Sequence, residues 1–173
     1  MPAGQQHGGG DRTRGEATGE IIAVTDDWTG GWTGYDEAIK RLIKEPLRNP
    51  PGTRFVYSDI GFIALGEVVR RVSRMSLDQF AKQNIFNPLR MNDTGFRPAS
   101  TKKARIAPTE KRRGQLSYLG DTGENAGPGG EVWLRGQVHD PTSYRMDGVA
   151  GHAGLFSTAN DLAIYCQMIL NGG

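Results

Sequence analysis

The sequence predicts a mainly α-helical fold in one folding unit, with long loops between the helices. Segments with helical spacing of apolar residues or with capping residues occur at four places along the chain. Strands of clearly alternating polarity are few, and 173 residues suit one domain with a real core better than two. The composition agrees, because 36% hydrophobic and 23% charged residues are typical of a globular protein rather than a disordered chain.

The amino-terminal residues are expected to lie outside this fold. Residues 1–25 are expected to be a disordered or unrelated tail, because their Gly, Gln, Arg and Thr residues show no periodicity. The domain is expected to span residues 26–173. Near its start, Trp28 and Trp32 lie in a glycine-rich run, and their rings are expected to pack on the next segments of the chain.

Two helices are predicted in the first half of this domain. One covers residues 35–44 and ends because Pro46 cannot continue it. The other covers residues 60–74, with Asp59 available as its N-cap. The apolar residues of this second helix cover a broad face, and Glu67 is expected on the solvent side.

Two further helices are predicted from capping signals. Ser76 and the Gln three residues later have the spacing of a capping box, so a helix is expected over residues 77–85. Thr158 and Asp161 repeat that spacing and open a helix that runs through Leu170.

The segment between these helices, residues 97–147, is expected to be mostly irregular. Its Gly, Pro, Lys and Arg content is high, and short strands are predicted only around residues 115–119 and 131–138. A cluster of basic residues lies here without interleaved aromatic residues, which favours a solvated loop over a phosphate-binding patch. The cluster consists of Lys102, Lys103, Arg105, Lys111, Arg112 and Arg113.

Charge and composition exclude several classes of function. A formal charge of +2, spread along the chain, gives no field that would gather nucleic acid or anionic lipid. The single cysteine, Cys166, cannot form an internal disulfide and is expected on a buried helix face. No metal or other cofactor is expected, because three scattered histidines and one cysteine give no zinc-ligand spacing. No apolar run has the length of a membrane span or forms a signal-peptide core.

The most specific pattern is the run from Pro51 to Phe62, Pro-Gly-Thr-Arg-Phe-Val-Tyr-Ser-Asp-Ile-Gly-Phe. It resembles the Pro-Gly-x-x-Phe-x-Tyr-Ser-Asn stretch of class C serine β-lactamases, penicillin-binding proteins, D-alanyl-D-alanine carboxypeptidases and related esterases. Further similar runs continue in family order: Leu65–Glu67, Ile85–Leu89, Met91–Phe96, Ile106–Glu110, Val138–Asp140, Gly151–Thr158 and Asp161–Ala163. The resemblance implies an α/β parent fold of the β-lactamase/transpeptidase type, with helices around an antiparallel sheet. This chain would supply mostly its α-helical part.

The resemblance also implies a chemistry, namely acyl transfer on a β-lactam, an ester or a D-alanyl peptide. In that family a Ser-x-x-Lys pair supplies the nucleophile and a tyrosine shuttles its proton; Tyr57 matches that tyrosine. A phenol with a reference pKa of about 10 needs cationic neighbours to act as a base near neutrality. Asp59 stands where many members have an amide that contacts substrate, and an ionised carboxylate there can only accept hydrogen bonds.

Each of these residues also has a plainer interpretation. Tyr57 before a helix is by spacing alone a packing residue, and Asp59 an ordinary N-cap. His152, between glycines, either lines the substrate-binding cleft or has a structural role. His139 and Asp140 belong to a loop typical of the family and receive no chemical role.

The nucleophile itself is not expected within this sequence. Ser100 and Lys103 have the Ser-x-x-Lys spacing, but they come after Tyr57, and the Lys, Arg and Pro108 after them cannot form a buried apolar helix. The chain is therefore expected to be an incomplete serine hydrolase, inactive alone, and to self-associate through apolar surface that it leaves exposed.

The alternative is a noncatalytic module that binds peptidoglycan-like peptides or partner proteins. If the complete protein follows its family, its acyl substrate is a small molecule or a peptide and its location is periplasmic or extracellular.

Overall fold

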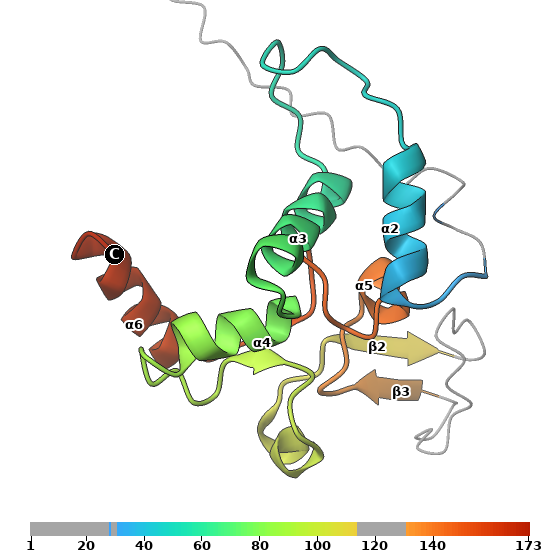
Figure 1. Ribbon diagram of the computed structural model, residues 1–173. Helices are drawn as coiled ribbons and strands as arrows, with labels where there is room; N and C mark the ends of the chain where they lie inside the picture. The colour runs from blue at the N-terminus through green and yellow to red at the C-terminus, as the bar shows by residue number, and fades with distance from the viewer. Residues whose placement is uncertain (1–27, 29–30, 114–130) are drawn as a thin grey trace, which may run out of the picture.

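The structure, a computed structural model, describes Trp28, residues 31–113 and residues 131–173 (Figure 1). The expected tail at residues 1–25 and the predicted strand at 115–119 lie outside the described residues. Helices dominate the described parts, as predicted. Their bounds are α2 Tyr35–Lys44, α3 Asp59–Ser73, α4 Leu77–Ala81, the π-helix η1 Lys82–Phe86, the 3-10 helix η2 Ser100–Arg105, α5 Pro141–Arg145 and α6 Ala159–Leu170.

The described strands form two small antiparallel sheets. Strand β1 (Gly95–Phe96) pairs with β4 (Leu155–Phe156), and β2 (Glu110–Arg113) pairs with β3 (Glu131–Leu134). The strand predicted over residues 131–138 is thus confirmed only in its first half. The prediction that the basic cluster forms a solvated loop is wrong for Lys111, Arg112 and Arg113, which lie in strand β2.

Pairing on the β2–β3 ladder explains why basic residues can form a strand here. The Lys111 Nζ lies 5.2 Å from the centre of the Trp133 ring on the opposite strand, at the register position directly across from it. A long Lys side chain can cover an aromatic ring while its ammonium stays in water. That cross-strand contact is invisible to a search for alternating apolar residues.

The larger core forms around the two tryptophans, as the sequence predicts. The Trp28 and Trp32 rings meet edge to face, with centroids 5.6 Å apart and an interplanar angle of 83°. Helix α2 contributes Ala38 and Ile39, and α3 contributes Ile63. Met146 and Ala150, which come after α5, complete the buried cluster.

Glu67 is buried in α3, and the prediction that it faces solvent is wrong. Its side chain lies in the contact between α3 and α2, where three donors compensate the charge. Tyr35 of α2 donates its hydroxyl at 3.0 Å, and Arg70 and Arg71 of α3 donate at 2.7 and 2.6 Å. The i, i+3 and i+4 spacing of the two arginines brings both guanidiniums to the same carboxylate.

A smaller core lies between α4–η1 and α6. Ala81, Phe86 and Met91 are its buried members, and Ile164 of α6 packs against them. The predicted helix at residues 77–85 is confirmed in extent, with its second half wound as a π-helix. Cys166 is exposed, so its predicted burial is wrong, because α6 meets this core with the face that carries Ile164.

The capping residues were predicted correctly for one helix out of three. Thr158 caps α6 by accepting a hydrogen bond from the Asp161 N–H at 3.1 Å. Ser58, not Asp59, caps α3 and accepts from the Gly61 N–H at 3.3 Å. Ser76 does not cap α4, because its hydroxyl donates to the Asp78 side chain instead.

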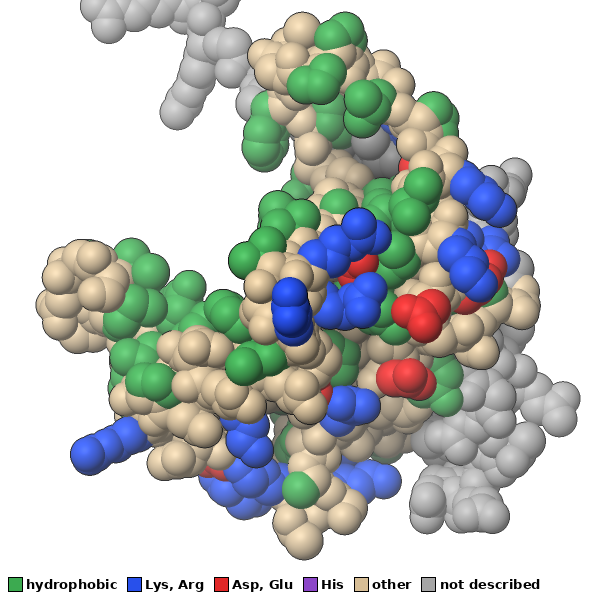
Figure 2. All heavy atoms as spheres, viewed as in Figure 1, with side chains coloured by type: hydrophobic (Ala, Val, Ile, Leu, Met, Phe, Trp, Pro, Cys, Tyr) green, Lys and Arg blue, Asp and Glu red, His purple; other side chains and the backbone are tan. Residues whose placement is uncertain are grey.

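Large apolar side chains remain exposed along α3 and α6. Figure 2 shows apolar side chains along both helices, on the two sides of the hollow between them. On α3 and α6 the exposed members are Phe62, Leu65, Val68, Val72, Leu162, Tyr165, Ile169 and Leu170. Within the described ranges, no helix combines the length and the hydropathy that crossing a bilayer requires.

Candidate functional site

Tyr57 lies at the surface, directly before α3. The backbone from residue 54 to 57 forms neither helix nor strand, and Ser58 then starts the helix, so the phenol stands beside the first turn of α3. The Tyr57 residue is 46% exposed. Its ring lies 5.6 Å from the ring of Phe62, one turn further along. This tyrosine is therefore accessible to a reacting group rather than sealed in a core.

Acidic neighbours govern the protonation of Tyr57. The charge of Asp59 is the largest cause of a raised pKa; desolvation, a hydrogen bond to Asp59 and the charge of Asp140 act in the same direction. With these neighbours Tyr57 is a neutral phenol at physiological pH. It can then donate a proton, whereas acting as a base needs an added positive charge nearby.

Asp59 occupies the first position of α3 and is not its N-cap. Because the Ser58 hydroxyl already satisfies the Gly61 N–H, the Asp59 carboxylate has no capping task. Its negative charge is favourable at the amino end of a helix. The predicted capping role is thus wrong, while the carboxylate remains next to the Tyr57 phenol.

The third predicted residue, His152, is joined to Asp140. The His152 Nε2 lies 2.9 Å from the Asp140 Oδ1, and the His152 side chain is only 2% exposed. The other ring nitrogen, Nδ1, is buried and has no hydrogen-bond partner among the described residues. A carboxylate accepts hydrogen bonds, so Nε2 carries the proton in this pair.

Asp140 is held from a second side by the backbone of α5. Its Oδ1 also accepts from the Ser143 N–H at 2.6 Å, which makes Asp140 the N-cap of that helix. Burial works to raise the pKa of Asp140, but the hydrogen bonds from His152 and Ser143, with the charges of His152 and His139, outweigh it. The pKa therefore lies below its usual range, and Asp140 is ionised near neutrality.

Close glycine contacts fix the loop that carries His152 to α3 and to the residues after α5. A β-carbon at position 151 would lie 1.9 Å from the Phe62 carbonyl oxygen, so only glycine fits there. Gly154 has a φ of +112°, and a β-carbon there would lie 2.4 Å from the Gly148 carbonyl oxygen. The loop and the first turns of α3 thus meet backbone to backbone, which places His152 one residue from that contact.

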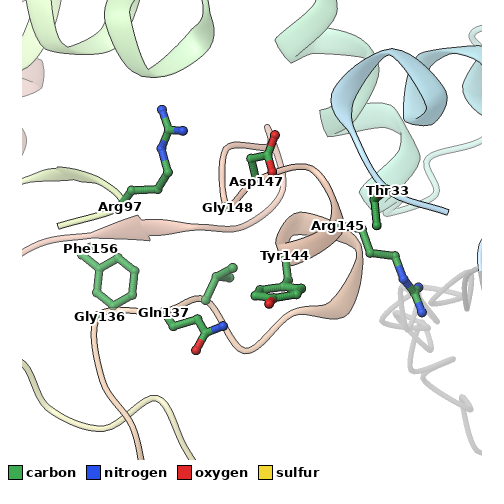
Figure 3. Close-up of a pocket in the computed structure, with 10 residues that line it drawn as sticks. Thr33, Arg97, Gly136, Gln137, Tyr144, Arg145, Asp147, Gly148 and Phe156 are labelled. Atoms are coloured by element: carbon green, nitrogen blue, oxygen red, sulfur yellow. The ribbon is translucent and has the colours of Figure 1, made fainter. Parts of the chain in front are cut away.

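A cavity of about 490 Å³ lies away from the predicted site residues, and neither Tyr57, Asp59 nor His152 lines it (Figure 3). Both arginines that line it already serve the fold. Arg97 forms an ion pair with Asp78 at 2.6 Å, and Arg145, whose guanidinium points away from the other labelled side chains, donates to the Trp28 carbonyl. We therefore place the candidate site at Tyr57.

The Ser-x-x-Lys spacing at Ser100 does not form a nucleophile site. It lies in the 3-10 helix η2, which has no buried residue, so neither side chain is desolvated as a catalytic pair requires. The neighbouring Lys102 is held by Asp93 at 2.7 Å. The sequence-based rejection of this pair is consistent with its place in the structure.

Asp140 is the residue that sequence reasoning passed over. The sequence gives it no chemical role, yet it binds His152, and its charge is among the causes that raise the Tyr57 pKa. One signal was present: an Asp directly before a Pro is typical of an N-cap with the first helical residue after it. That pattern predicts a helix start at residue 140 but does not indicate the histidine twelve residues away.

Comparison with known proteins identifies the family. The profile of the Beta-lactamase family matches residues 11–173, and the chain belongs to that family. It is 39% identical over 144 residues to a Bacillus subtilis protein named N-acetylmuramyl-L-alanine amidase, covering 80% of this chain and 31% of the relative. It is 36% identical over 141 residues to a Salmonella schwarzengrund protein whose name describes a D-alanyl-D-alanine carboxypeptidase, covering 78% of this chain and 31% of that protein. The chain thus spans about a third of the length of these curated relatives.

A solved structure agrees at the level of the fold. The octameric penicillin-binding protein homologue from Pyrococcus abyssi superposes with a TM-score of 0.52 at 22% identity. The match covers 80% of this chain and 27% of that one. The predicted fold class is confirmed: the chain has part of a β-lactamase and penicillin-binding-protein fold, with helices and small antiparallel sheets.

Proposed function

We propose that this chain is the tyrosine-bearing part of a serine hydrolase that works by acyl transfer, with Tyr57 as the proton shuttle. The observation that carries the proposal is the position of Tyr57, half-exposed beside the first turn of α3. Membership of the Beta-lactamase family supports the same reaction class.

The proposed reaction has two steps. The serine Oγ bonds to the substrate carbonyl carbon while its proton passes to the Tyr57 oxygen. The bond from that carbon to the leaving nitrogen breaks as Tyr57 returns the proton to the nitrogen. Water then cleaves the acyl ester and releases a carboxylic acid, which regenerates the serine hydroxyl.

The substrate that we propose is an alanine-containing peptide with a scissile amide bond. The names of both curated relatives describe cleavage of an amide bond next to alanine, which favours a peptide over an ester or a β-lactam. Asp59 would accept a hydrogen bond from a substrate N–H. His152 would contribute to the substrate-binding wall through the glycine-rich loop beside α3.

We further propose that the 173 residues alone are inactive. The acidic neighbours of Tyr57 favour its neutral form, so the first proton transfer needs a cation such as the lysine of a Ser-x-x-Lys pair. The only pair with that spacing among the described residues lies in exposed η2. The nucleophile would therefore come from polypeptide outside these residues.

Labelling and complementation test this proposal. The purified chain is expected to give no covalent adduct with a fluorophosphonate or a labelled penicillin, as measured by intact-protein mass spectrometry. Mixing it with a family polypeptide that carries the Ser-x-x-Lys helix is expected to restore release of D-alanine from a D-alanyl-D-alanine peptide. Adduct formation by the chain alone would contradict the proposed inactivity.

Tyr57→Phe measures the role of the phenol in that complemented reaction. Loss of a positioned proton donor and acceptor is expected to lower kcat by about 10²–10⁴-fold. Tyr165→Phe on α6 is the matched control and should leave kcat unchanged. If Tyr57→Phe were as active as the control, or if the peptide bound reversibly without turnover, a noncatalytic binding module would replace the hydrolase.

A further inference from the structure

Two matching apolar stripes line the hollow between α3 and α6. On each helix three large apolar side chains are spaced three and then four residues apart, which places them on one helix face. The stripes consist of Leu65, Val68 and Val72 on α3 and of Leu162, Tyr165 and Ile169 on α6. Even the least exposed of them, Tyr165, is 37% exposed, and Figure 2 shows apolar side chains on both sides of the hollow. Each helix thus has an apolar face in addition to the one that meets the core.

An apolar cavity of about 410 Å³ joins these two walls. Leu162 and Tyr165 of the α6 stripe line it together with Leu77 of α4 and Gly151. Leu77 also lies against Gly66 of α3. Apolar surface therefore continues from the α6 stripe past α4 to α3.

The charged residues of the two helices, beyond the first turn of α3, are engaged away from this surface. Asp161 of α6 is buried and accepts a hydrogen bond from the Asp93 N–H at 2.9 Å. On α3, Arg70 and Arg71 are both bound to Glu67, on the side of the helix that meets α2. A partner in the hollow would meet apolar side chains, and a charge that it buried there would stay unpaired.

These walls fit an α-helix rather than an extended segment. Backbone N–H and C=O groups need hydrogen-bond partners wherever water is excluded. A strand would need a sheet edge, but both walls are helices. A helix satisfies its backbone groups internally, and helices pack against each other through stripes of this spacing. One added helix can therefore cover both stripes at once.

We propose that this hollow receives the apolar helix that carries the nucleophile, with the first turn of that helix beside Tyr57. A catalytic serine and lysine pair requires a buried apolar helix, and the hollow is apolar surface on which such a helix can be buried. The α3 face leads to the tyrosine, because Phe62, three residues before Leu65, is exposed and its ring lies 5.6 Å from the Tyr57 ring.

Polypeptide for this role exists in the longer relatives. The match to this chain covers 31% of the Bacillus subtilis relative and 31% of the Salmonella schwarzengrund relative, so most of their length lies outside it. The inference rests on the proposed function for what the helix carries. The shape and the apolar character of the docking site follow from α3, α4 and α6 alone.

A peptide that cannot react tests the docking without any turnover. The probe is a synthetic, dye-labelled peptide with the sequence of the Ser-x-x-Lys helix of a family member, in which alanine replaces the serine. Fluorescence anisotropy against the 173-residue chain is expected to show saturable binding. Sedimentation velocity should show a 1:1 complex that replaces self-associated chain, because the peptide covers the same apolar surface.

Substitutions on the two walls locate the binding site. Leu65→Lys on α3 and Ile169→Lys on α6 are each expected to weaken binding by about tenfold or more, because the ammonium would lose water without gaining a partner. Ile43→Lys is the matched control: Ile43 is 71% exposed but lies on α2, and its substitution should leave the Kd unchanged. Circular dichroism checks that all three variants keep the helix content of the wild type.

The inference is overturned if the peptide does not bind, or if the control substitution weakens binding as much as those on the walls. It is also overturned if a peptide of residues 158–171 of this chain binds more tightly than the family helix, since the hollow would then belong to a second copy.

Binding and turnover separate this inference from the proposed function. Docking at the walls without hydrolysis in the complemented reaction would refute the proposed function and leave the docking site. Restored hydrolysis in which both wall variants are as active as Ile43→Lys would keep the function and refute the docking site.

Discussion

Glu67 joins α3 to α2 through the hydrogen bond that it accepts from Tyr35. Hydrogen bonding from Arg70 is the largest cause that lowers its pKa to about 2; Arg71 and Tyr35 add to this effect, and burial opposes it. The same contact raises the pKa of Tyr35 to about 12, chiefly through burial and then through its bond to Glu67. The three donors together compensate the charge of a residue that is only 5% exposed, where an unpaired carboxylate would be unstable.

Glu67 should therefore make the free energy of unfolding depend on pH in the acid range. Its folded pKa of about 2 lies below the usual 4.5, so its contribution is fully present above about pH 4.5 and is lost as pH falls toward 2. The expected size is on the order of 1–3 kcal/mol, reduced by the exposure of the two arginines. Glu67→Gln should lower the free energy of unfolding at pH 7 and flatten the acid limb, as measured by urea unfolding between pH 2 and 7.

Glu37 on α2 provides the matched control for this prediction. It forms partly exposed i+3 and i+4 ion pairs with Lys40 and Arg41, at 3.7 and 3.3 Å. Such helix pairs contribute about 0.2–0.5 kcal/mol, so Glu37→Gln should leave the acid limb almost unchanged. Equal effects of the two substitutions would show that burial of Glu67 adds nothing to its ion pairs.

At the scale of elements, the contact between α3 and the glycine-rich loop holds His152 close to the helix that follows Tyr57. Gly66 and Gly151 lie against each other, and the Phe62 carbonyl fills the space beside Gly151. Such a contact has no room for side chains, so the loop cannot shift along the helix without losing it.

Gly151→Ala should therefore destabilise the protein and displace the loop. The added methyl group would meet the Phe62 carbonyl at 1.9 Å, and overpacking of this kind costs about 1–3 kcal/mol or more. Gly61→Ala on the same helix turn is the control, because its β-carbon would meet only ordinary contact at 3.7 Å. The control should be neutral or slightly stabilising by helix propensity. Thermal unfolding followed by circular dichroism distinguishes the two; a Gly151→Ala protein as stable as the control would contradict the close contact.

Local signals in the sequence were sufficient for some elements and insufficient for others. Helices α2, α3 and α6 could be predicted because their signals are local. These signals are the spacing of apolar residues, Pro46 after α2 and Thr158 before α6. The strand β2, the burial of Glu67 and the Asp140–His152 contact depend on partners 12 or more residues away, so no local pattern could indicate them. The assignment of Tyr57 to a catalytic site comes from family motifs and stays a prediction, whereas its acidic environment became visible only in three dimensions.

At the scale of the whole molecule, large apolar side chains are exposed on α3 and α6, and contiguous exposed apolar surface commonly marks a site of association. Val72 on α3 and Leu170 on α6 are 81% and 79% exposed, and their neighbours on the same faces are apolar as well. In the longer relatives, of which this chain matches about a third, further polypeptide is available to cover such surface.

The isolated chain should consequently self-associate, and charged substitutions should reverse this. Sedimentation velocity across a hundredfold range of concentration is expected to show oligomers or aggregates for wild type. Leu65→Lys combined with Val72→Lys, both at exposed positions, should move the distribution toward monomer with helix content unchanged by circular dichroism. Lys40→Ala on α2 serves as the control. A wild-type chain that stays monomeric and unfolds cooperatively on heating would contradict the prediction.

The edge-to-face packing of Trp28 on Trp32 gives the protein a built-in optical reporter. Both indoles are buried in the core that joins α2, α3 and the residues after α5, whereas Trp133 lies exposed on β3. The fluorescence of Trp28 and Trp32 should shift to longer wavelength when that core unfolds. The emission of Trp133 should already resemble that of an indole in water. After Trp133→Phe, emission alone would therefore report whether the scaffold behind Tyr57 is assembled, even when no substrate is turned over.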